Sequence, residues 1–154
     1  MKNKFVTTCV AIAFAAALAT SAAASDHAAG RCSLARAAGK YSFTDNGTVV
    51  GVGPRTAVGT LTLDGQGNVL NGVATSSLNG SVASETFSGS YTVNADCSGS
   101  IDVKIYSGGT ELFEITGATA YDDDMKQMRG VFTSVTEPEG TVLLTVINLE
   151  ARKQ

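Results

Sequence analysis

The stretch that indicates the fold most clearly is GTLTLDGQGNV, residues 59–69. Thr and Leu alternate as far as Leu63, and a turn of Asp, Gly, Gln and Asn follows before the chain becomes apolar again. Alternation with a period of two is typical of a half-buried β-strand, and Asx-Gly turns commonly join antiparallel strands. The stretch GSYTVNADCSGSI, residues 89–101, repeats the same order of strand, turn and strand. Two such hairpins predict an antiparallel β-sheet.

Similar turns divide the rest of the chain into strands of this kind. The predicted strands cover residues 40–50, 56–64, 68–77, 82–94, 99–107, 110–121, 126–136 and 140–151. Almost all the connections have hairpin length, whereas parallel strands need crossovers of about a dozen residues or more. We therefore expect an all-β domain, an antiparallel up-and-down barrel of about eight strands, because closure leaves no strand edge exposed. A two-sheet β-sandwich fits the same pattern and is the alternative.

The first residues indicate export. A basic start, Met1–Lys4, precedes the apolar run FVTTCVAIAFAAAL (5–18) and the small residues TSAAAS (20–25). This order is typical of a secretory signal peptide, so we predict a signal peptide at 1–24 and a secreted or periplasmic protein. A buried N-terminal helix is the alternative. No apolar stretch reaches the ~20 residues that span a bilayer, so no membrane span is expected after cleavage.

The remaining chain is predicted to hold one domain. Residues 25–39 have no strand pattern and are expected to form a flexible segment with a short helical turn at 33–38, ahead of the barrel at 40–154. Loss of Lys2 and Lys4 would change the formal net charge from −3 to about −5. The remaining Lys and Arg residues are scattered along the chain. The lack of a basic cluster argues against nucleic acid or an anionic membrane as a partner.

The cysteines predict a disulfide. Cys9 lies in the predicted signal peptide, which leaves Cys32 and Cys97 in the mature chain. An even pair in an exported protein favours a disulfide, with the two Cα atoms within ~7 Å of each other. The bond would tie the N-terminal segment to the turn between the fourth and fifth strands. The alternative, a reactive thiol at Cys97, lacks a neighbouring base and has Asp96 beside it.

Several kinds of catalytic and metal site lack their residues. The only histidine, His27, stands near the predicted mature terminus, which argues against Ser-His-Asp and Cys-His arrangements. Zinc has no ligands left once the cysteines pair. The acidic run 122–124 and the loop 64–68 offer oxygen ligands for calcium, but a solvated hairpin tip and an Asx turn explain them. We predict no catalytic residue, no metal and no cofactor.

Polar and aromatic residues on the strands are the remaining candidates for an interior site. They are Tyr41, Asn71, Glu85, Tyr91, Tyr106, Glu114, Tyr121 and Arg129. Side chains that point into a barrel line any ligand cavity it has. From this set we predict that a ligand would contact Tyr41, Asn71, Tyr91 and Glu114.

Glu114 has two interpretations. It lies in the apolar stretch LFEIT, and an inward carboxyl would have a raised pKa and could act as an acid or base. The alternation instead places Phe113 and Ile115 in the core and Glu114 in solvent. Other strands carry apolar residues on both faces, so part of the outer surface is expected to be covered by the N-terminal segment or by another copy of the chain.

The two hairpins also carry a family resemblance. Three stretches resemble small exported bacterial proteins of the allene-oxide-cyclase barrel-like group. They are GKYSF (39–43), AVGTLTLDGQGNV (57–69) and GSYTVNADCSGSI (89–101). That group has eight-stranded, calycin-type barrels, and the resemblance covers about residues 39–107. The resemblance implies an apolar cavity, which in the plant cyclases guides the folding of a fatty-acid epoxide. No functional residue of those enzymes can be matched to a position here.

Two functional hypotheses follow. The first is an exported, disulfide-linked barrel module that binds a small hydrophobic ligand or has a structural role in the cell envelope. The alternative is a cavity-guided isomerase or cyclase acting on a lipid-like substrate. A binder needs an apolar cavity of about 300 Å³ or more, and an enzyme needs in addition a buried ionisable group.

Overall fold

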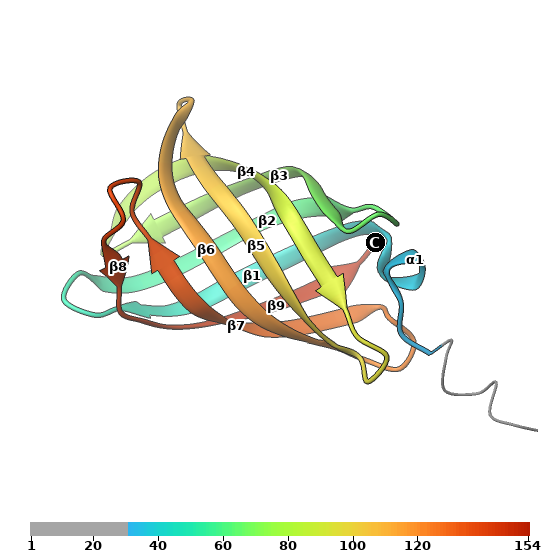
Figure 1. Cartoon of the computed structure of the whole chain (residues 1–154). Coiled ribbons are helices and arrows are strands. Elements are labelled where there is room, and N and C mark those ends of the chain that lie inside the picture. The colour runs from blue at the N-terminus through green and yellow to red at the C-terminus, as the bar shows by residue number, and fades with distance from the viewer. Residues whose placement is uncertain (1–30) are drawn as a thin grey trace, which may run out of the picture.

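The computed structural model describes residues 31–154. The predicted signal peptide, 1–24, and the start of the predicted N-terminal segment lie outside the described residues. The described part begins with one short helix, and β-strands follow (Figure 1). The elements are α1 (Leu34–Ala37), β1 (Gly39–Val49), β2 (Gly53–Leu63), β3 (Asn68–Leu78), β4 (Ser81–Val93), β5 (Ser98–Ser107), β6 (Thr110–Tyr121), β7 (Gln127–Thr136), β8 (Val142–Leu143) and β9 (Thr145–Lys153).

The strands form one antiparallel sheet that closes on itself. The order is β6-β5-β4-β3-β2-β1-β9-β7-β8, and β6 also pairs with β7. Strands β1 to β7 and β9 therefore make a closed eight-stranded barrel, to which β8 is added as a short extra strand. The predicted barrel is confirmed, and the sandwich alternative is wrong. In the described residues, no helix is long and apolar enough to cross a bilayer.

The C-terminal strand differs from the prediction. Residues 140–151 were expected to form one strand, but β8 and β9 divide this region and share β7 as their neighbour. The pairing of β7 with β9 reaches Val131↔Asn148, and its pairing with β8 starts at Val135↔Leu143. Between these pairs the backbone of Leu144 bonds instead to the turn that follows β1, where its carbonyl accepts from Val50 N. Residues 132–134 of β7 therefore pair with neither β8 nor β9, and the sheet is open locally there.

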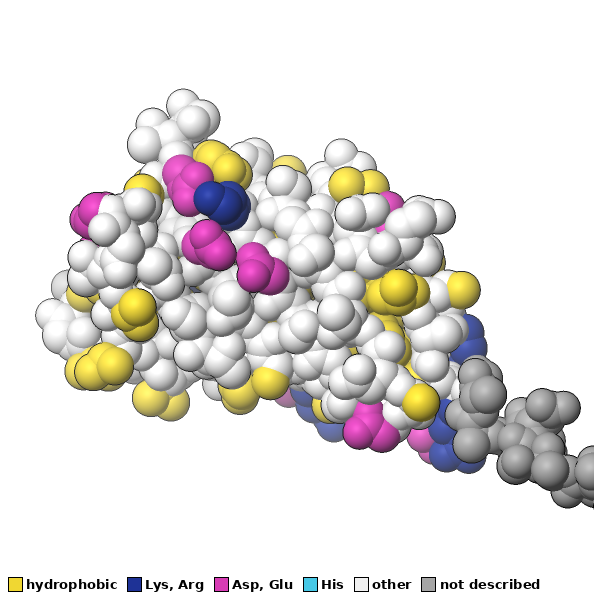
Figure 2. Space-filling model, in the orientation of Figure 1, with side chains coloured by type: hydrophobic (Ala, Val, Ile, Leu, Met, Phe, Trp, Pro, Cys, Tyr) yellow, Lys and Arg dark blue, Asp and Glu magenta, His cyan; other side chains and the backbone are white. Residues whose placement is uncertain are grey.

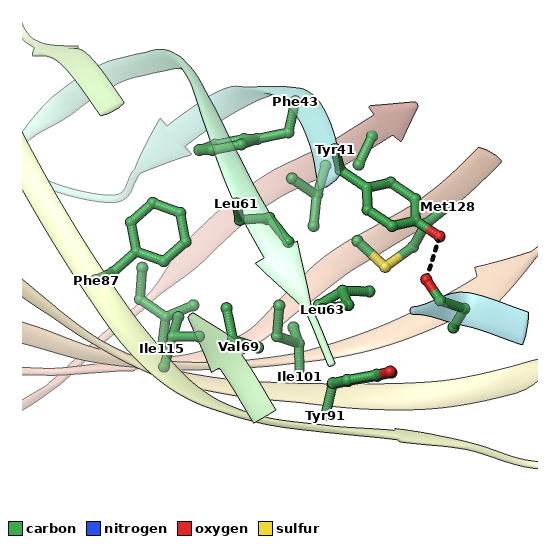
Figure 3. Packing of buried hydrophobic residues seen from close by; sticks show 14 of the residues in the cluster. Tyr41, Phe43, Leu61, Leu63, Val69, Phe87, Tyr91, Ile101, Ile115 and Met128 are labelled. Carbon is green, nitrogen blue, oxygen red and sulfur yellow. Dashed lines mark hydrogen bonds between the residues drawn. The ribbon is translucent and has the colours of Figure 1, made fainter. Parts of the chain in front are cut away.

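The alternation of each strand sends apolar side chains into the barrel. On β1, Tyr41 and Phe43 are buried, while Ser42 and Thr44 between them are exposed. Phe43 meets Phe87 of β4 edge to face, with ring centroids 5.6 Å apart, an arrangement that aromatic pairs favour (Figure 3). The buried cluster runs along the barrel axis and draws on every long strand. Its residues fill most of the interior.

The outer surface is not covered as we expected. Val142, Leu144 and Val146 are 60%, 70% and 74% exposed, and Figure 2 shows hydrophobic side chains scattered between polar ones on the face in view. The described N-terminal residues do not lie over this wall, because α1 packs at one end of the barrel (Figure 1). Coverage by another copy of the chain stays a prediction.

Candidate functional site

One end of the barrel is closed by α1. Ser33 caps the helix by accepting from Arg36 N, and Ala37 is fully buried against the core. The disulfide predicted between Cys32 and Cys97 is confirmed, with a Cα–Cα distance of 5.1 Å. Because Cys97 belongs to the turn between β4 and β5, this bond fastens the start of the described chain to the rim of the barrel.

Tyr41 and Tyr91, two of the predicted ligand-binding residues, lie under α1. The hydroxyl of Tyr41 donates to Ala37 O at 2.8 Å. The hydroxyl of Tyr91 donates to Asp64 O at 2.5 Å and lies 3.2 Å from Leu34 O of α1. Burial raises the pKa of each hydroxyl to about 12, so both stay protonated donors at neutral pH. Figure 3 shows Tyr41 reaching the backbone of α1 from inside the barrel. The Tyr41 hydroxyl therefore holds the helix against the closed end, while the Tyr91 hydroxyl is bound mainly to the turn between β2 and β3.

Asn71 and Glu114, the other two predicted ligand-binding residues, lie on the outer wall. Asn71 is exposed and has a positive φ of 51°, at the irregularity where the β3–β4 register shifts. The Glu114 carboxylate is 3.7 Å from Lys104 Nζ, and its side chain is 43% exposed. The structure thus gives Glu114 the outward position that the alternation favoured. Neither residue shares the interior with Tyr41 and Tyr91.

A cluster of charged side chains occupies the middle of the interior. Arg55 of β2 donates from Nη1 and Nη2 to the two carboxylate oxygens of Glu85 on β4, at 3.2 and 3.1 Å. Arg55 Nη2 also donates to Asp45 Oδ2 of β1 at 3.4 Å, and Ser76 Oγ donates to Glu85 Oε1 at 2.6 Å. Asp45, Arg55 and Glu85 are 2%, 8% and 4% exposed. We call these three residues the charged cluster.

The charged cluster is not fully paired. Glu85 is satisfied by the two-pronged bond from Arg55 and by Ser76. Asp45 Oδ1 and Arg55 Nε, by contrast, have no hydrogen-bond partner, although they lie only 3.4 Å apart. Two carboxylates also face a single guanidinium. Burial raises the pKa of Asp45, against the opposing effect of Arg55. A buried donor and acceptor without partners are costly, so this position favours a further polar group.

Two cavities meet at Arg55. The inner cavity, about 40 Å³, lies among the apolar core residues and is lined by all three members of the charged cluster. The outer cavity, about 150 Å³, lies at the end of the barrel opposite α1. Both are lined by Arg55, Ile115 and Phe132, so the guanidinium stands at the boundary between them. We call them the inner and outer cavities.

The outer cavity follows from the local opening of the sheet. Phe132 and Val135 of β7 line it together with Leu143 of β8 and Ile147 of β9, beside the point where β7 parts from β9 after Val131. Its remaining walls are apolar apart from Arg55 and Glu137; they are Val49, Val52, Leu78, Phe113 and Ile115. Val52 is 44% exposed and stands at the rim, in the turn between β1 and β2. The result is an apolar pocket with one charged residue at its inner boundary.

The calcium alternatives of the sequence are used by their own turns. Asp122 Oδ1 accepts from the backbone N–H groups of Lys126 and Gln127, and Asp64 Oδ1 accepts from those of Gln66 and Asn68. Within residues 31–154, no group of three or more His, Cys, Asp or Glu side chains is arranged to hold a metal ion.

The sequence signal for the charged cluster is the strand alternation itself. Asp45 follows Tyr41 and Phe43 at steps of two, and Glu85 precedes Phe87 by two. A strict extension of these two patterns places both carboxylates inside the barrel. Glu85 is among the candidates predicted from the sequence, whereas Asp45 and Arg55 are not, because a charged residue on a strand is ordinarily assigned to the solvent face.

No family model and no curated protein matches the chain. Solved structures that are similar to it include two redesigned beta barrels. A redesigned beta barrel, b11L5F_LGL, has a TM-score of 0.48 and 16% identity, and the alignment covers 79% of this chain and 95% of that one. The redesigned beta barrel mFAP0, bound to DFHBI, has a TM-score of 0.48 and 16% identity over 77% of this chain and 99% of that one.

Proposed function

We propose that this protein is an exported binding module that holds a small hydrophobic ligand in the outer cavity. The observation that carries the proposal is the apolar pocket of about 150 Å³ at the end of the barrel that α1 leaves free. A cavity of that volume lined by Leu, Ile and Phe is known to take up benzene. Val52 at its rim is partly exposed, which supports entry from solvent.

The volume limits the ligand. Cavities that enclose drug-sized molecules usually measure about 300–1,000 Å³, and the outer cavity is about 150 Å³. The ligand we propose is therefore the size of a single aromatic ring or a short branched chain, smaller than the fatty-acid derivative that the family resemblance implied. The resemblance to the allene-oxide-cyclase barrel-like group stays a prediction.

The enzyme alternative requires a sufficiently large cavity and a buried ionisable group, and only the second of these is supported. Asp45 is a buried ionisable group beside a cavity, which a cavity-guided isomerase or cyclase would need. The cavities are too small for a lipid-like substrate. If the protein is an enzyme, its substrate is of the same small size, and the binding experiment below precedes any search for turnover.

Export is the second part of the proposal. The disulfide between Cys32 and Cys97 supports an oxidising compartment, since such bonds are rare in the cytosol. We expect the exported protein to begin at Ser25, directly after the predicted cleavage site, and N-terminal sequencing of secreted or periplasmic protein measures this. An intact Met1 on the exported protein would contradict the predicted signal peptide.

Binding can be measured by NMR titration of methyl-labelled protein. Benzene and toluene should shift the methyl resonances of Val135, Leu143 and Ile147 in a saturable way, whereas laurate should not. If neither benzene nor toluene gives a saturable shift, the binding proposal is wrong and the structural role in the envelope is left.

A matched pair of rim variants locates the binding site. Val52→Trp should lower the toluene affinity at least about tenfold, because Val52 lines the outer cavity and a larger side chain would obstruct it. Val50→Trp is the control, since Val50 is exposed in the same turn but does not line the cavity. Equal loss in both variants would place the ligand elsewhere.

A further inference from the structure

The unpaired atoms of the charged cluster specify the chemistry of the ligand's polar end. Arg55 Nε carries a hydrogen with no acceptor, and Asp45 Oδ1 is an acceptor with no donor. The two atoms are 3.4 Å apart, inside a barrel where both side chains are more than nine-tenths buried. Arg55 also lines the outer cavity, so a group entering from that cavity meets the guanidinium first.

A hydroxyl group is the complement of this pair. Its oxygen can accept from Arg55 Nε while its hydrogen is donated to Asp45 Oδ1. An ammonium group offers donors only and would leave the Arg55 N–H unpaired beside a second positive charge. A carboxylate offers acceptors only and would add a third negative charge to Asp45 and Glu85.

We propose that the ligand of the outer cavity is a small apolar alcohol or phenol, whose hydroxyl bonds to Arg55 Nε and Asp45 Oδ1 at the boundary between the two cavities. This inference rests on the proposed binding function. The remaining groups around Asp45 favour the same uncharged partner: Glu85 is already satisfied by Arg55 and Ser76, and the neighbouring wall from β6 and β9 is Ile115 and Leu149.

Four probes of nearly equal shape test the inference: ethylbenzene, benzyl alcohol, benzylammonium and benzoate. We expect saturable binding of ethylbenzene and benzyl alcohol at the methyl groups of the outer cavity. The two ions should bind at least about tenfold more weakly, because each must leave water and place its charge beside a like charge, Arg55 for benzylammonium and Asp45 and Glu85 for benzoate. The Arg55 Nε–H resonance should shift with benzyl alcohol and remain in place with ethylbenzene.

Failure of this inference is distinct from failure of the proposed function. If no probe binds, the binding function itself is wrong. If ethylbenzene and benzyl alcohol both bind and neither moves the Arg55 Nε–H resonance, the hydrophobic pocket stands and the hydroxyl inference is overturned. Arg55 Nε and Asp45 Oδ1 would then be satisfied by water only. Stronger binding of benzoate or benzylammonium would also overturn it.

A variant adds a second measurement. In Asp45→Asn, an amide N–H₂ facing the hydroxyl would replace the acceptor, so the affinity ratio of benzyl alcohol to ethylbenzene should fall about three- to tenfold. Thr119→Val is the control, because Thr119 is buried and its Oγ1 is unpaired, yet it lines neither cavity. An unchanged ratio in Asp45→Asn would contradict the inference. If this variant does not fold, the Arg55 resonance in the wild-type protein still decides.

Discussion

At the scale of single residues, the charged cluster is the most sensitive part of the interior. Arg55 is the cation between two buried carboxylates, so Arg55→Met leaves Asp45 and Glu85 without this counter-charge. Removing one partner of a buried ion pair costs about 3–5 kcal/mol, and we expect a loss of that size in the free energy of unfolding measured with urea. The control is Lys104→Met on the outer wall, which breaks the ion pairs to Glu111 and Glu114 and should change stability little.

The same cluster predicts a dependence of stability on pH. The folded-state pKa of Asp45 is raised above its ordinary 3.8, so the folded protein binds this proton more tightly than the unfolded chain. Its contribution to stability is therefore present at low pH and is lost as the pH rises from 3.8 through the raised value. Asp64, Asp96 and Asp124 on the surface have lowered pKa values and act in the opposite direction. The difference between wild type and Asp45→Asn isolates the Asp45 effect.

This difference is measured by urea unfolding at a series of pH values. The free energy of unfolding of wild type minus that of Asp45→Asn should decrease as the pH rises from 3.8. A difference that increases with pH would show that Asp45 has a lowered pKa in the folded state.

At the scale of elements, α1 depends on its covalent attachment. The helix has four residues, too few to be stable alone, and the disulfide closes a loop across a sequence separation of 65. Loss of this loop closure in Cys32→Ala/Cys97→Ala should lower the free energy of unfolding by roughly 4 kcal/mol. Thermal and urea unfolding measure it. Dithiothreitol should destabilise the wild type and leave the double variant unchanged; equal stability of the two proteins would contradict the prediction.

The elements were the part of the structure that the sequence predicted best. Turns such as the one after Leu63 depend on Asp and Gly within a few residues, so local chemistry places them, and the strand ends of β1 to β7 lie within a few residues of the predictions. The C-terminal strand was harder, because its division into β8 and β9 depends on which part of β7 each one pairs with. The charged cluster is harder still, since its members meet only once β1, β2 and β4 have taken their places in the barrel.

At the scale of the whole molecule, the barrel is closed by β9, which pairs with β1 on one side and β7 on the other. Gly47 lies within β1 at this seam, opposite Ile147. A Cβ atom built there would stand 1.9 Å from Val146 O and 2.6 Å from Ile147 Cα, both of them backbone atoms that cannot move without moving β9. Gly47 therefore permits the close approach of the first and last strands.

Gly47→Ala should consequently weaken closure of the barrel. Because the clash is with backbone, we expect a loss of at least about 1–3 kcal/mol, the usual cost of overpacking, in urea unfolding. Faster amide exchange should appear first in β1 and β9, because these are the strands that must separate. Gly65→Ala is the matched control: the nearest atom to its added Cβ is 4.0 Å away, in α1, and its stability should change little. If Gly47→Ala has the same free energy of unfolding as the wild type and the same amide exchange at β1 and β9, closure of the barrel does not depend on this contact. In that case the ligand affinity of the outer cavity, which Ile147 lines, should be unchanged as well.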